Sequence, residues 1–110
     1  MRYYLIDEVS LSDMKKTDGF LEQNAIRSEL EKIFWVAIPE GILNEVQSRH
    51  KGCQPYLFSI EMGADWIQVE LFIRSQQGLR CTCQSYCTPL QRDFIFDFTE
   101  KMIKELGVRT

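Results

Sequence analysis

Residues 78–91, GLRCTCQSYCTPLQ, hold three of the four cysteines in this 110-residue chain and connect two expected elements of structure. Gly78 ends a turn, and residues 79–83 have the composition of a starting strand. Thr88, Pro89 and Gln91 predict a helix start, because threonine caps, proline fits the first helical position and glutamine completes a capping box. The thiols are therefore expected where the sheet meets the last helix.

The last helix is predicted from apolar residues that recur at helical spacing after Pro89. They are Leu90, Phe94, Phe98, Met102 and Leu106, broadened by Ile95 and Ile103. Such a stripe is typical of a helix that buries one face against the core. Gly107 suits the left-handed residue that closes a helix, and Val108 can make the accompanying apolar contact.

The clearest hairpin comprises residues 56–62 and 66–74, joined by the short loop Gly63-Ala64-Asp65. In its second strand apolar and polar side chains alternate, which predicts an antiparallel strand buried on one face. The apolar positions are Ile67, Val69, Leu71 and Ile73. We expect the last helix to pack on this face.

The first half of the chain adds two strands and two helices. Residues 2–7 predict a strand, Ser10 or Ser12 caps a helix, and residues 33–38, IFWVAI, predict a central strand covered on both faces. Residues 40–49 predict a short helix with Ile42, Leu43 and Val46 inward. The order β-α-β-α-β-β-β-α predicts an α+β fold over residues 1–110, a single domain with helices on one side of a mostly antiparallel sheet.

The composition predicts a folded cytoplasmic protein. Hydrophobic residues make up 45% of the chain, and no apolar run has the length of a membrane span or signal sequence. The net charge of −3 argues against nucleic acid as a partner. We therefore expect an unknown protein partner or small ligand, with no nucleic acid and no membrane. In the cytoplasm, clustered cysteines are more often metal ligands or catalytic thiols than disulfides.

The cysteines form two half-sites, His50-x-x-Cys53 and Cys81-x-Cys83, with Cys87 four residues further on. Two short ligand pairs far apart in sequence are typical of structural zinc sites. Cys53, Cys81 and Cys83 are the first three expected ligands, and His50 and Cys87 compete for the fourth position. Iron–sulfur occupancy is compatible with the same thiols.

The Cys81-x-Cys83 spacing places a condition on this site. In a flat strand the two side chains share a face but stand roughly 6.5–7 Å apart. Tetrahedral zinc holds its sulfurs roughly 3.8 Å apart. Both cysteines can therefore bind one ion only if the chain bends there or the side chains converge.

Cys87 offers the main alternative to a metal site. It immediately precedes the cap of the last helix, where amide dipoles, Arg80 and Arg92 are expected to lower its pKa and make it the most reactive thiol. The chain is then a thiol-based redox or sensor protein. If all four cysteines are instead buried as small apolar residues, it is a metal-free interaction domain.

Residues 33–91 resemble a family of small uncharacterised bacterial proteins. The similarity lies in FWVAIP, His50-x-x-Cys53-x-Pro55, ELFIRS and Cys81-x-Cys83-x-x-Tyr86. It implies a family of unknown function and contributes no catalytic residue. The chain has no glycine-rich phosphate loop or recognised catalytic constellation. The sequence thus favours a small metal-binding domain acting as a binding or adaptor module over an enzyme.

Overall fold

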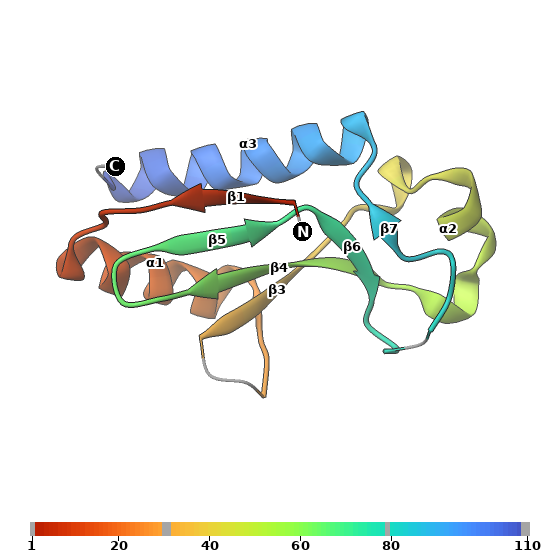
Figure 1. The fold of residues 1–110 in the computed structure, drawn as a ribbon, viewed down its shortest axis with the longest axis horizontal. Coiled ribbons are helices and arrows are strands. Elements are labelled where there is room, and N and C mark those ends of the chain that lie inside the picture. The colour runs from red at the N-terminus through yellow and green to blue at the C-terminus, as the bar shows by residue number, and fades with distance from the viewer. Residues whose placement is uncertain (1, 30–31, 79, 109–110) are drawn as a thin grey trace.

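The computed structural model describes residues 2–29, 32–78 and 80–108, and their elements confirm the α+β fold (Figure 1). The strands are β1 (Tyr3–Ile6), β2 (Ile26–Arg27), β3 (Ile33–Ala37), β4 (Tyr56–Met62), β5 (Ile67–Glu70), β6 (Phe72–Ser75) and β7 (Ser85–Tyr86), and the helices are α1 (Leu11–Asn24), α2 (Glu45–Arg49) and α3 (Pro89–Leu106). Two short 3₁₀ turns, Glu40–Ile42 and Lys51–Cys53, flank α2.

The sheet is antiparallel and is organised around β4. Its strand order is β1-β5-β4-β3-β2, and β6 pairs with β4 and with β7. The predicted second hairpin strand is interrupted at Leu71, so β5 pairs with one end of β4 and β6 with the other. The Leu71 carbonyl accepts a hydrogen bond from the Cys87 amide, which aligns β7 beside β6.

The core lies between the sheet and two helices, α1 and α3, which cover the same face (Figure 1). Phe58 on β4 is fully buried and makes edge-to-face contacts with Phe94 and Phe98 of α3. The predicted stripe of α3 is displaced by one position over its first part, where Gln91, Ile95 and Thr99 are buried, whereas Met102 is buried as predicted. Ile95 and Met102 are fully buried, whereas Leu90 is 58% exposed.

Within the described residues no helix covers the opposite face of the sheet, where Tyr3 and Leu5 are exposed, so the predicted coverage of residues 33–38 on both faces is wrong. Burial alternates along β3: Phe34 and Val36 face the helices, while Trp35 is only half-buried. The predicted helix over residues 40–49 is also shorter, and Val46 points outward because the helix buries the polar Gln47 instead.

The cysteine-bearing segment between β6 and β7 is not a strand over residues 80–83. The Gln84 amide donates to the Cys81 carbonyl at 3.2 Å and closes a turn there. Leu79, the first residue of the predicted strand, lies outside the described residues. The turn supplies the bend that two converging Cys81 and Cys83 side chains require.

Candidate metal centre

The first half-site is built by two successive short helical turns. His50 follows the last residue of α2, and its amide donates to the carbonyls of Val46 and Gln47 at 3.2 Å. The Cys53 amide then donates to the His50 carbonyl at 3.0 Å. Residues three apart in a 3₁₀ turn lie on the same side, so this turn directs both side chains into one site.

The second half-site is the turn between β6 and β7. Cys83 is almost fully buried and Cys81 is half-buried. The pairing of Tyr56 with Ser75 brings this turn against the first half-site, because it joins the start of β4 to the end of β6. The Ser75 hydroxyl donates to the Cys53 carbonyl and fixes the two segments together.

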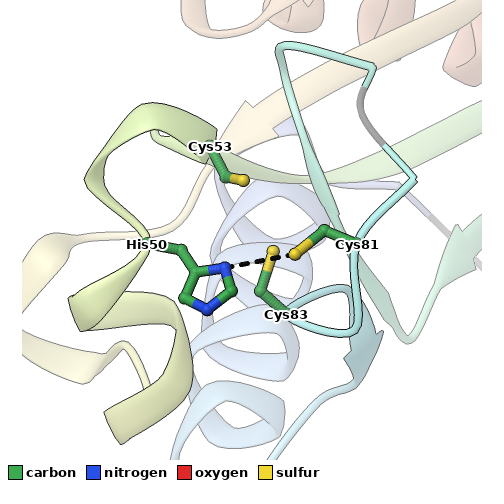
Figure 2. Close-up of side chains that lie close together, drawn as sticks. All are labelled: His50, Cys53, Cys81 and Cys83. Atoms are coloured by element: carbon green, nitrogen blue, oxygen red, sulfur yellow. Dashed lines mark hydrogen bonds between the residues drawn. The ribbon is translucent and has the colours of Figure 1, made fainter.

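Four predicted ligands meet at one point (Figure 2). The ligand atoms of His50, Cys53, Cys81 and Cys83 all lie within 4.8 Å of one another. Within the group, His50 Nδ1 lies 3.1 Å from Cys81 Sγ. Tetrahedral zinc places its sulfur ligands roughly 3.8 Å apart, so little movement separates this arrangement from a complete coordination shell.

The electrostatics of this group favour a cation at its centre. Burial, followed by the neighbouring Cys83 and Cys81 thiols, raises the pKa of Cys53 to about 11. The backbone N–H of Cys83, together with the Cys83 thiol and His50, lowers the pKa of Cys81 to about 7. Three adjacent thiols cannot all ionise without a positive charge between them, and a metal ion supplies that charge.

Two buried glutamines hold the site against α3. Gln47 and Gln91 each complete a helix capping box, with Asn44 and Thr88 respectively. Gln91 Nε2 donates to Gln47 Oε1 at 2.8 Å, and Gln47 Nε2 donates to the Cys83 carbonyl at 3.2 Å. Of these two boxes only Thr88–Gln91 was predicted from the sequence, and the matching Asn44-x-x-Gln47 spacing is the signal for the other.

Tyr56 adds a buried hydroxyl to the same region, which sequence reasoning also missed. The residue is 1% exposed, and burial followed by the Cys83 thiol raises the pKa of Tyr56 above its ordinary value. Its hydroxyl oxygen makes no hydrogen bond within the described part of the chain. The sequence shows only a tyrosine at the start of an expected strand, and nothing in it indicates that the hydroxyl is buried without a hydrogen-bond partner among the described residues.

Cys87 lies outside the group formed by the other four candidates. Its amide bonds to Leu71 at the β6–β7 junction. The predicted lowering of its pKa is wrong, because burial raises the pKa of Cys87 and outweighs the opposing effects of Arg92, its own amide and Arg2. Of the two competitors for the fourth position, the structure therefore places His50 beside the three thiols.

These pKa shifts predict which thiol reacts first in metal-free protein. Cys81, half-buried and with a pKa of about 7, should be alkylated by iodoacetamide before Cys53 and Cys87, whose pKa values are raised. Its labelling rate should rise as pH passes through 7 and level off above it, because the thiolate is the nucleophile. Peptide mass spectrometry over a time course measures this order, and labelling of Cys87 first would contradict it.

The comparisons with known proteins add no family to this description. No family model matches the chain, and neither a curated protein nor a solved structure matches it. Within the described residues, no helix is both long and apolar enough to cross a membrane.

Proposed function

We propose that this chain is a small metal-binding domain in which His50, Cys53, Cys81 and Cys83 hold one structural zinc ion. The observation that carries the proposal is the convergence of these four ligand atoms within 4.8 Å. The ion would join the turn after α2 to the turn between β6 and β7. Four protein ligands complete a tetrahedral shell, which is typical of a structural rather than a catalytic zinc site.

The compactness of the group favours one ion over an iron–sulfur cluster. A cluster places bridging sulfides between its irons, so its protein ligands stand further apart than those of a single ion. Three sulfurs and one nitrogen in tetrahedral arrangement suit zinc or a single iron. Zinc is our choice because this mixed set of thiolates and imidazole is a common structural zinc shell.

Elemental analysis of protein purified without added metal tests this proposal. We expect about one zinc per chain, since four such ligands close one tetrahedral site. Chelation should remove the zinc and lower the melting temperature, and zinc added back should restore both. A metal-free protein that takes up no zinc and melts unchanged after chelation would overturn the proposal.

A binding or adaptor role is supported by the uncovered face of the sheet. A hollow of about 440 Å³ opens there beside Trp35 and Leu57, and its wall includes Arg80 and Gln84. These two residues flank the Cys81–Cys83 pair in sequence. A metal ion that fixed this turn would therefore also fix one wall of the hollow, which is the physical link between the metal site and a bound partner.

A thiol-based redox function is the second candidate, favoured by the 3.1 Å contact between His50 Nδ1 and the half-buried Cys81. A histidine beside a thiol stabilises the thiolate that reacts with oxidants. Hydrogen peroxide would then take two electrons from Cys81 and a neighbouring thiol, giving a disulfide and two waters. A reversible disulfide in protein that binds no zinc would favour this function over the metal site.

A further inference from the structure

The hydroxyl of Tyr56 has no hydrogen-bond partner within the described residues, although its side chain is 99% buried by the surrounding protein. Leaving a buried donor unsatisfied costs free energy, and native proteins rarely do so without a functional reason. Every other side chain of β4 on this face is apolar: Phe58, Ile60 and Met62. An orphaned hydroxyl at this position therefore indicates a missing acceptor.

Tyr56 belongs to the same buried core cluster as Cys53 and Cys83, two cysteines of the proposed metal centre. Burial is the largest cause of the raised pKa of Tyr56, and Cys83 is the next, ahead of Cys53 and Cys81. A neutral thiol is a weak acceptor, so a thiol beside the hydroxyl is no partner of ordinary strength. A thiolate is a much stronger acceptor, because hydrogen bonds to charged groups are shorter and stronger than those between neutral groups.

The charge of a loaded centre also calls for such a donor. A divalent ion with three thiolates and a neutral imidazole carries one net negative charge. Cys53 and Cys83 are buried, whereas His50 and Cys81 are half-buried, so two of the three sulfurs have little contact with water. Outer hydrogen-bond partners orient the ligands of metal sites and tune them, and they are part of the affinity of such sites.

We propose that Tyr56 is a positioning residue of the metal centre, whose hydroxyl donates a hydrogen bond to the Cys83 thiolate when the metal is bound. This inference rests on the proposed metal function and adds a residue outside the four ligands. The hydroxyl, which has no hydrogen-bond partner among the described residues, would gain a strong acceptor in this thiolate. Tyr56 thus links metal occupancy to the stability of the sheet on which it stands.

Replacing Tyr56 by phenylalanine separates this role from packing, because it removes only the hydroxyl. In Tyr56→Phe the metal-free protein should melt at the same temperature as wild type or higher, since the orphaned donor is gone. The zinc-loaded variant should melt lower than loaded wild type. Zinc affinity, measured by competition with a chromophoric chelator, should fall roughly 10-fold to 100-fold, as for other outer partners of metal ligands.

Cobalt substitution gives a direct readout at the sulfur atoms. A hydrogen bond stabilises the lone pairs of a thiolate, so losing it should move the sulfur-to-cobalt charge-transfer band of Tyr56→Phe to longer wavelength. Tyr4→Phe is the matched control, because its hydroxyl bonds to Glu100 at 3.1 Å on the surface between β1 and α3. Tyr4→Phe should leave the cobalt spectrum and zinc affinity unchanged.

The outcomes distinguish this inference from the proposed function. A wild-type protein without any sulfur-to-cobalt band would overturn the metal site and the role of Tyr56 together. A normal band that is identical in wild type and Tyr56→Phe, with equal zinc affinity, would overturn the role of Tyr56 alone. A melting shift of the same sign in metal-free and loaded protein, with an unchanged band, would reduce Tyr56 to packing and also overturn it.

Discussion

Cys83→Ala should abolish stoichiometric zinc binding and cause one of the two largest losses of stability expected in this protein. Cys83 is 1% exposed, and its sulfur belongs to the four-atom group. Because metal binds the folded state, it stabilises that state by about 4 kcal/mol when free zinc is about 1,000 times its dissociation constant. The variant should lose most of this contribution.

Urea unfolding of wild type and variant at one fixed free zinc concentration measures this effect. The difference between them should shrink strongly once a chelator is present, leaving only the packing cost of the lost sulfur. Cys87→Ala is the matched control, because Cys87 lies outside the group and should leave zinc content unchanged. Equal zinc in Cys83→Ala and wild type would contradict the assignment.

The local half of the metal site could be predicted from the sequence. His50 and Cys53 are three residues apart, and a single turn is enough to bring them together. The meeting of the two half-sites also follows from the predicted hairpin. Its strands begin at Tyr56 and end near Ser75, so antiparallel pairing must place the flanking residues side by side. The His50-x-x-Cys53 spacing and the pairing of the hairpin strands are thus enough to predict that the two half-sites meet.

The choice of the fourth ligand could not be predicted from the sequence. A position before a helix cap predicts a stabilised thiolate at Cys87, but that effect acts against the cost of burial. Burial depends on the break at Leu71, which holds Cys87 half-buried beside β6. The apolar positions Val69, Leu71 and Ile73 keep their alternate spacing through the break, and Phe72 on the polar face is a departure that does not by itself predict one.

The face of α3 that enters the core was predicted only approximately. The apolar residues of this helix cover much of its circumference, so their periodicity defines a broad stripe but not the centre of that stripe. The two buried polar residues Gln91 and Thr99 lie on the inner face because each has a partner there. Gln91 bonds to Gln47, and the Thr99 hydroxyl donates to the Ile95 carbonyl. Polar residues with satisfied hydrogen bonds thus shift the buried face away from Leu90.

Phe58→Ala should cost about 3–5 kcal/mol of unfolding free energy, the usual range for emptying a buried phenylalanine site. Phe58 is fully buried at the centre of β4, and its ring lies 6.0 Å from that of Phe98 and 6.4 Å from that of Phe94. The sheet and helix backbones on either side limit collapse into the cavity. Urea denaturation of zinc-saturated protein measures the loss without interference from the metal.

Phe98→Ala is the matched comparison, because it removes the same group from the other side of the same contact. Phe98 is only partly buried on the rim of the core, between Phe58 and Phe20. Water can enter part of the space that it leaves, so the cavity term should be smaller and the loss clearly below that of Phe58→Ala. Zinc content should stay the same in both variants, since neither ring belongs to the ligand group. An equal or larger loss in Phe98→Ala would show that the core is centred on α3 and not on β4.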